Sequence, residues 1–314
     1  MDRAYPAPLT ASVLEKSYVQ KGCMPMLIAL RPAPPRVTVV VPAYRQARHL
    51  PLALQSLAHQ TTPDWGAVIV DDGSNDDGSD GSNDDGSDSS NDGSNDGATL
   101  AAAGAFLRSR PPGQVTVLAE AHGGVARARN LGLQRVESPE VLFLDADDEL
   151  LPPALARLSA ALGEAPDAVA AYGQPLFVGE DSQPIPTSWT WNEAGAGSRL
   201  TFADACPDPH IYPPGCVLVR RWAAIAAGGF DAAMVAYEDQ DFWLRLLLVG
   251  PMVALGDVAC LYRRHGGNAT GNLDRMRPWL AVAERKTLAY QQAWQYRRTW
   301  PDPGGSRPWP PGRG

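Results

Sequence analysis

Two pairs of carboxylates in this chain follow short apolar runs. Asp71 and Asp72 come directly after one run, and Asp145 and Asp147 follow another. Such runs are typical of buried parallel strands, and ligands bind at the carboxyl ends of these strands. Alternate carboxylates there can bind one hard cation, Mg²⁺ or Mn²⁺, which bridges diphosphate oxygens and stabilises a departing phosphate. The pattern indicates metal-assisted phosphate chemistry, although solvated turn carboxylates would explain each pair taken alone.

Three further groups could take part in the same chemistry. Glu238 and Asp239 open a run with helical apolar spacing. A carboxylate in that position can be a general base, or it can simply interact favourably with the helix dipole. His265 follows a strand-like run and precedes two glycines, so it could bind the metal or a phosphate, or do neither.

The elements that must position these groups alternate regularly in the first half of the chain. Apolar and β-branched runs predict strands, and apolar residues three to four apart predict helices. The expected strands are 37–41, 65–70, 115–118 and 141–144, and the expected helices are 50–60, 99–108, 125–136 and 152–162. This alternation predicts a parallel, doubly wound α/β sheet with right-handed crossovers, in which both acid pairs face one crevice.

The second half is less regular. We expect strands at 168–177, 216–219 and 252–262, and helices at 221–227, 238–249 and 273–299, the last with a break near Pro278. Residues 179–215 are rich in Pro, Gly and Trp, and no structure is assigned to them. We expect acceptor selection in residues 170–215.

The net charge of −8 comes from one segment. Ten aspartates lie between Asp71 and Asp96, and without them 27 basic residues face 25 acidic ones, so the remainder carries +2. That segment is a tandem repeat, DGSNDDGS at 72–79 and again at 80–87, with a shortened copy at 88–94. Deleting 77–96 leaves an ordinary strand-to-helix connection, which indicates a short loop expanded by duplication.

The repeat cannot form a core, because it has no apolar side chain and dense like charge. A solvated, mobile loop is the simplest interpretation, and long loops cost little closure entropy. Its Asp, Asn and Ser oxygens would suit Ca²⁺. No segment completes a twelve-residue calcium loop, however, since the twelfth position counted from Asp88 is Thr99.

Composition limits the remaining classes. The four cysteines have no paired spacing, which favours free thiols over a zinc site or a disulfide framework. The first residues lack a secretory pattern, and no apolar run approaches the ~20 residues that span a bilayer. There is no basic stripe for nucleic acid. We therefore expect a cytoplasmic protein, with peripheral association at the inner face of a membrane left open.

Taken together, the motifs resemble glycosyltransferase family 2, whose members are inverting enzymes with a GT-A fold. The matching segments keep the family's order and spacing between about 36 and 270. They are VVVPAY at 39–44, HQT at 59–61, VDDGS at 70–74, GGVARARN at 123–130, LDADD at 144–148, GFD at 229–231, ED at 238–239 and WLR at 243–245. Two features depart from the pattern: Arg45, where the family often has Asn, and the repeat itself.

The resemblance implies a hexosyltransferase-like enzyme of polysaccharide biosynthesis. It implies a GT-A sheet, Rossmann-like and mostly parallel, with a smaller mixed region on the acceptor side. The donor would be a nucleoside-diphosphate sugar, with a UDP-sugar as the preferred candidate, and the acceptor a glycan, a lipid-linked sugar or a protein. The cofactor would be Mg²⁺ or Mn²⁺.

The resemblance also implies a role for each matching residue. Asp239 would be the general base with Glu238 beside it, and Asp147 and His265 would bind the metal. The donor or its nucleotide would contact the remaining residues of the site, which are Pro42, Ala43, Tyr44, Asp71, Asp72, Arg129 and Asp145.

The resulting division of the chain has four parts: a flexible leader at 1–35, the transferase domain at 36–270 with the repeat loop at 71–97, a helical segment at 271–300 and a disordered tail at 301–314. One alternative is a catalytically impaired nucleotide-sugar binding protein whose acidic repeat mediates an interaction. A sugar nucleotidyltransferase is another, but residues 42–44 provide no glycine- and basic-rich phosphate loop.

Overall fold

The computed structural model describes residues 33–74, 97–187, 195–206, 213–268 and 273–299. The predictions of a mobile repeat within 75–96, of a disordered tail and of most of the leader lie outside the described residues. Everything below concerns the unit that begins at Pro35.

Four apolar runs of the first half form adjacent parallel strands. They are β1 (Val37–Ala43), β2 (Trp65–Asp72), β3 (Val115–Glu120) and β4 (Glu140–Phe143), in the order β3-β2-β1-β4. Every residue of β1 and β2 is buried, as expected for central strands covered on both faces. The predicted parallel sheet is confirmed.

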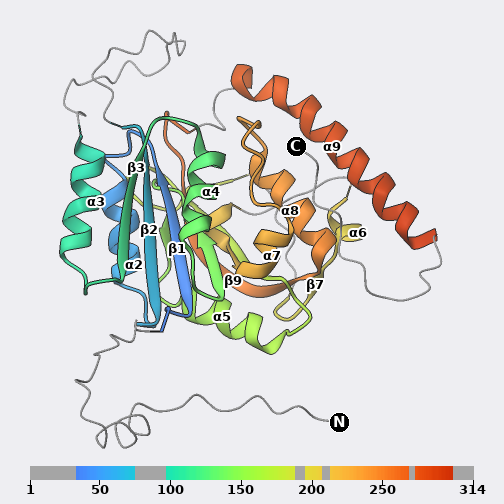
Figure 1. Cartoon of the computed structure of the whole chain (residues 1–314), viewed down its shortest axis with the longest axis horizontal. Coiled ribbons are helices and arrows are strands. Elements are labelled where there is room, and N and C mark those ends of the chain that lie inside the picture. Colours follow the sequence, from blue (N-terminus) through green and yellow to red (C-terminus); the bar gives the residue numbers. More distant parts are fainter. Residues whose placement is uncertain (1–32, 75–96, 188–194, 207–212, 269–272, 300–314) are drawn as a thin grey trace, which may run out of the picture. The chain divides into compact units, whose positions relative to one another are not determined.

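The connecting helices cover this sheet. They are α2 (Leu50–Ala58), α3 (Ala98–Arg108), α4 (Val125–Arg135) and α5 (Ala154–Glu164). Figure 1 shows α4 in front of β1 and β2, and α2 behind them. Gly132 explains how closely α4 approaches, because a Cβ on this residue would lie 2.2 Å from Cγ1 of Val40.

The second half extends the sheet with mixed pairing. β8 (Val217–Arg220) runs antiparallel to β4 and to β6 (Ala170–Val178), and β9 (Met252–Arg263) runs parallel to β6. β5 (Glu149–Leu150) and β7 (Arg199–Leu200) pair antiparallel with β9. The predicted GT-A arrangement, a parallel sheet followed by a smaller mixed region, is confirmed. The two-residue strands were not predicted, because so short a run has no periodicity.

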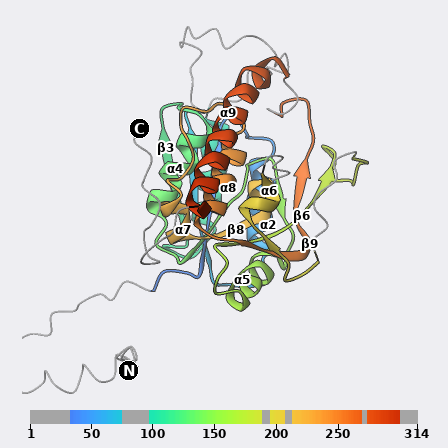
Figure 2. The same ribbon diagram turned by 90° about the vertical axis from the view of Figure 1, so that its right-hand side faces the viewer.

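The remaining helices are short except for two. A 3₁₀ turn at Pro214–Cys216 precedes β8, and α6 (Phe202–Ala205) and α7 (Arg221–Ala226) are brief. α8 (Glu238–Val249) packs beside the long α9 (Leu273–Thr299), as Figure 1 and Figure 2 show. The predicted break near Pro278 is wrong: α9 is one helix across it. Proline so close to the amino end removes only the hydrogen bond to the Asp274 carbonyl, which the rest of a long helix tolerates.

An aromatic cluster fixes α8 against the parallel strands. The ring of Phe143 at the end of β4 lies edge-on to Phe230 at 4.8 Å, and Phe230 packs on Phe242 of α8 at 4.3 Å. These rings are at most 3% exposed. The first turn of α8 is therefore brought towards the carboxyl ends of the strands by hydrophobic packing.

Two sequence expectations concern thiols and membranes. Cys206, Cys216 and Cys260 have free thiols, as expected, and Cys23 lies outside the described residues. Within the part of the chain that the structure describes, no helix has both the length and the apolarity to cross a bilayer.

Candidate functional site

The predicted acids gather at one edge of the sheet because their strands are parallel neighbours. Ala43 at the end of β1 pairs with Asp71 at the end of β2. On the other side of β1, the amide of Leu144, just before Asp145, donates to the Val40 carbonyl. Both acid pairs therefore follow strands that end at the same edge, as the sequence predicted.

Arg129 of α4 joins residues from distant parts of the chain. Its guanidinium donates to Oδ1 of Asp145 at 2.6 Å and to Oε1 of Glu238 at 2.8 Å. The side chain is only 3% exposed and also lies over the Phe230 ring. A buried cation requires such partners, so this bridge holds the turn after β4 against the first turn of α8.

Asp239 occupies the first turn of α8 beside Glu238. Its Oδ1 accepts a hydrogen bond from the Gln240 amide at 2.7 Å, and the side chain is partly buried. Burial and the neighbouring Glu238 carboxylate raise the pKa of Asp239 to about 7, although Arg129 acts in the opposite direction. A carboxylate that ionises near neutral pH is suited to general base catalysis.

The residue that starts α8 is strained. Tyr237 has φ +61°, in the left-handed region that non-glycine residues rarely adopt. Its carbonyl accepts the Asp241 amide at 3.0 Å. Such strain costs of order 1–3 kcal/mol and persists only where surrounding contacts hold it, often at functional sites.

Asp147 and His265 form a pair from two separate elements. His265 follows β9, and its Nε2 lies 3.0 Å from Oδ2 of Asp147. His49, before α2, stacks on the His265 ring at 4.6 Å, and Asn268 lies beside the Asp147 carboxylate. The sequence analysis did not predict that His49 or Asn268 belongs to the site. Only the fold brings these two residues close to Asp147 and His265.

This pair fits part of a divalent metal site. A carboxylate oxygen and an imidazole nitrogen are both ligands for Mn²⁺, and Mg²⁺ commonly takes one or two carboxylates and completes its shell with phosphate and water. Among the described residues, no group of three or more His, Cys, Asp or Glu side chains could hold an ion.

Arg263 holds the turn that carries Asp147, and the sequence analysis predicted no role for it. It is fully buried at the end of β9. Its Nε donates to the Asp147 carbonyl at 3.0 Å, its backbone amide donates to Oδ1 of Asp148 at 2.9 Å, and it pairs with Glu149. These contacts fix the turn that carries Asp147.

A second corner of the site surrounds Asp72. Its two oxygens accept the amides of Gly123 and Gly124 at 2.9 Å each, and it lies 3.0 Å from Nδ1 of His122. The His122 ring stacks on Tyr44 at 4.1 Å. Asp72 thus anchors the loop before α4, and the exposed His122 ring and the half-buried Tyr44 ring stack beside it.

The other donor-side predictions lie at the ends of β1 and β2. Pro42 and Ala43 are buried, and Pro42 is tolerated because β4 no longer pairs with β1 at this level. Asp71 is 1% exposed, and burial raises its pKa. Arg45 has φ +51°, in the left-handed region that Asn adopts more readily than Arg. This backbone conformation explains why Asn is common at this position in the family that the sequence resembles.

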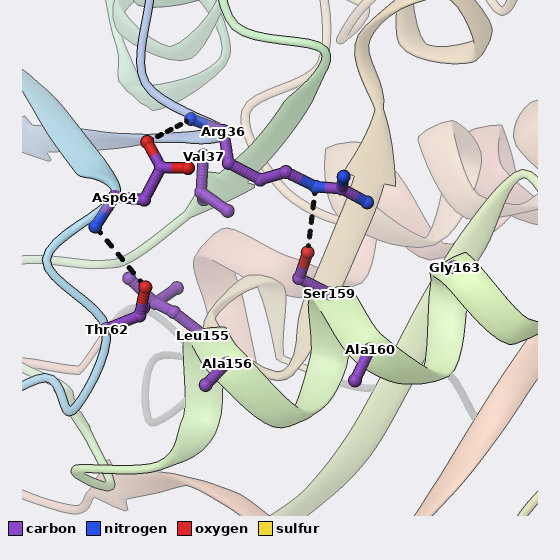
Figure 3. Close-up of a pocket in the computed structure, with 9 residues that line it drawn as sticks. All are labelled: Arg36, Val37, Thr62, Asp64, Leu155, Ala156, Ser159, Ala160 and Gly163. Atoms are coloured by element: carbon purple, nitrogen blue, oxygen red, sulfur yellow. Dashed lines mark hydrogen bonds between the residues drawn. The ribbon is translucent and has the colours of Figure 1, made fainter.

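A cavity lies elsewhere in the described part of the chain. Its volume is about 400 Å³, and it lies at the amino end of β1. Figure 3 shows the residues that line it, which are Arg36, Val37, Thr62, Asp64, Leu155, Ala156, Ser159, Ala160 and Gly163. Its one cation, Arg36, already pairs with the buried Glu140 at 2.7 Å. This cavity is at the edge of the sheet opposite the acids, so it is not part of the candidate site.

Comparison with known families identifies the family to which the sequence is similar. The model described as glycosyl transferase family 2 matches residues 38–82 and 89–225, and the interruption falls inside the repeat.

Three curated relatives show the range of similarity. The chain is 26% identical over 239 residues to an uncharacterised protein of Mycobacterium tuberculosis, covering 71% of this chain and 65% of that protein. It is 26% identical to a PGL/p-HBAD biosynthesis glycosyltransferase of Mycobacterium bovis, covering 77% and 82%. It is 22% identical to chondroitin synthase of Pasteurella multocida over 94% of this chain. The chain spans only 28% of that synthase, and less than two thirds of the first relative.

Solved structures resemble the fold. TarS 1-349 of S. aureus in complex with UDP superimposes with a TM-score of 0.57 at 20% identity, covering 84% of this chain and 71% of TarS 1-349. The same protein in complex with UDP-GlcNAc gives a TM-score of 0.56 at 20% identity, covering 79% and 66%.

Proposed function

Because the chain belongs to glycosyl transferase family 2, we propose that it transfers a sugar from a nucleoside-diphosphate sugar to an acceptor hydroxyl, with inversion at the anomeric carbon. The observation that carries the proposal is the Arg129 bridge. It links Asp145, at the edge where the strand ends meet, to the acid pair that opens α8, at 2.6 and 2.8 Å.

The proposed reaction is a single in-line displacement. The acceptor oxygen attacks the anomeric carbon, the bond from that carbon to the diphosphate oxygen breaks, and Asp239 takes the hydroxyl proton. The pKa of Asp239, raised to about 7, makes this carboxylate a better proton acceptor than an ordinary aspartate. Arg129 keeps the Glu238 carboxylate paired, so that Asp239 is the acid left for the proton.

Asp147 and His265 are the residues that would hold a divalent cation. A bound Mg²⁺ or Mn²⁺ supplies positive charge that stabilises the leaving diphosphate. The donor set supports this assignment, because an adjacent carboxylate and imidazole leave coordination positions for ligand oxygens.

We assign nucleotide recognition to the corner around Asp72. Its stacked Tyr44 and His122 rings offer a π surface for a base, and the loop amides that Asp72 holds lie at the amino end of α4. The structures of TarS in complex with UDP and UDP-GlcNAc favour a UDP-sugar among nucleotide sugars. A glycan or lipid-linked acceptor agrees with the names of the relatives. A protein is a third class of acceptor to test. A lipid-linked acceptor would place the enzyme at the cytoplasmic face of a membrane.

The test is a donor screen. Purified protein with Mn²⁺ is incubated with a panel of nucleotide sugars, scored by thermal shift and by release of nucleoside diphosphate. We expect one donor to stabilise the protein and to be slowly hydrolysed, with hydrolysis lost in EDTA. An absence of stabilisation and of turnover with every donor would contradict the proposal.

A second candidate is favoured by the repeat, which starts at a predicted nucleotide-binding acid. In this alternative the chain binds a nucleotide sugar without turnover, and the acidic loop binds a partner. Deleting residues 77–96 separates the two. An active deletion variant with unchanged kinetics supports the transferase, whereas a wild-type chain that binds the donor but never releases diphosphate supports the binding protein.

A further inference from the structure

The long C-terminal helix contacts the first turn of α8 through two polar side chains. Lys286 and Tyr290 lie one turn apart on α9. Nζ of Lys286 lies 2.8 Å from Oδ1 of Asp241, and the Tyr290 hydroxyl donates to the same oxygen at 2.7 Å. Asp241 is 3% exposed and lies two residues after Asp239. The helix outside the sheet thus reaches the turn that carries the proposed base.

The other oxygen of Asp241 is held from within α8. Arg245 donates twice to Oδ2 of Asp241, at 2.6 and 2.9 Å, and also donates to the Gly229 carbonyl at 2.6 Å. Lys286 makes a second bond, to Oδ2 of Asp231 at 2.6 Å. Two cations therefore face two carboxylates, and each Asp241 oxygen has partners. Removing one member would deprive the buried Asp241 carboxylate of a partner in a medium of low dielectric, so the network holds this turn rigidly.

The network is joined to the strained start of α8 through Asp241. Tyr237, at φ +61°, needs its neighbours to keep this conformation. Its carbonyl is bonded by the amide of Asp241, whose side chain α9 holds. The direction of the Asp239 carboxylate depends on the same turn. The family match ends at residue 225, so neither α8 nor α9 lies in the matched region.

We propose that Lys286 and Tyr290 are positioning residues, through which α9 fixes the first turn of α8 and the direction of Asp239. This inference rests on the proposed function. Apolar packing of α9 on the core uses the rings of Tyr290 and Trp294, and the Trp294 ring lies 5.7 Å from that of Phe202. This packing does not require the Lys286 ammonium or the Tyr290 hydroxyl.

The test compares Lys286→Met, Tyr290→Phe and the double variant with Arg285→Met and Leu288→Ala, two exposed positions of the same helix. We expect the double variant to lower kcat about 100-fold, the loss typical of small misplacements of catalytic groups, with donor KM and UDP binding unchanged. Lys286→Arg should restore part of kcat. Amide hydrogen exchange at 237–241 should accelerate in the double variant and stay at the wild-type rate in both controls.

The outcomes separate the two claims. A wild-type enzyme that transfers no sugar contradicts the proposed function. An active wild type, with a double variant whose kcat and exchange rates stay within twofold of the controls, overturns the positioning role. Equal losses in kcat and UDP affinity also overturn it, because they indicate general loosening of the fold. If the double variant does not fold, Tyr290→Phe removes one oxygen atom at constant shape and carries the same comparison.

Discussion

The raised pKa of Asp239 makes a direct prediction about pH dependence. Burial and the adjacent Glu238 carboxylate raise this pKa to about 7 from an ordinary value of 3.8. A general base works only when deprotonated, so kcat/KM should rise with pH through about 7 and level off above it. At pH 6 about a tenth of the plateau rate is expected, because only that share of the carboxyl is ionised.

Asp239→Asn is the matching substitution. The amide keeps the shape but cannot take a proton, so we expect kcat to fall by about 10²–10⁴-fold and the acid limb near pH 7 to disappear. Donor binding should be retained. Glu164→Gln, an exposed carboxylate near the opposite edge of the sheet, is the control and should behave as wild type. The assay is release of nucleoside diphosphate between pH 5 and 9 at constant ionic strength.

The same group affects stability, with a definite sign. A folded-state pKa above the unfolded value means that folding favours the protonated form. This contribution is present below about pH 4 and is lost as pH rises through about 7. Asp239→Asn should therefore raise Tm relative to wild type at pH 8, raise it less at pH 5 and have little effect below about pH 4. Two kinetic results would refute the assignment of Asp239 as the base. One is a kcat/KM profile whose acid limb is centred near pH 4, and the other is an Asp239→Asn variant that keeps both the limb near pH 7 and a kcat similar to wild type.

Three further substitutions test other parts of the site. Arg129→Met leaves the buried Glu238 and the half-buried Asp145 carboxylates unpaired and should cost about 3–5 kcal/mol of unfolding free energy in urea denaturation. Arg127→Met, exposed on the same helix, should change it little. Gly132→Ala puts a Cβ 2.2 Å from the Val40 side chain of β1 and should lower the free energy of unfolding by about 1–3 kcal/mol. Gly163→Ala is the control, because the nearest side-chain atom to its added Cβ, Nη2 of Arg36, lies at 4.0 Å, and this variant should be neutral or stabilising. His265→Ala should weaken Mn²⁺ binding about tenfold or more by calorimetry in the presence of UDP; unchanged affinity would remove His265 from the metal site.

Local sequence was sufficient for the first half of the fold. The β-branched run at 37–41 and the apolar runs at 65–70 and 141–144 specify buried strands, and alternation with helices specifies parallel pairing. Because parallel strands end at a common edge, the sequence alone also predicted that Asp71 and Asp145 lie at the same edge of the sheet. Two-residue strands such as β5 and β7 could not be found, since they exist only through pairing with β9.

Only the tertiary structure determined which partners the acidic residues have and how deeply they are buried. Nothing in the spacing of Arg129 and Glu238, 109 residues apart, indicates that they share an ion pair with Asp145. Likewise, the sequence of α9 does not indicate that Lys286 and Tyr290 contact α8 at Asp241. The sequence determined which residue types occupy the strand ends and helix starts, because periodicity and propensity are local. Burial, pairing and pKa arise from groups that are distant in the chain, so only the packed structure sets them.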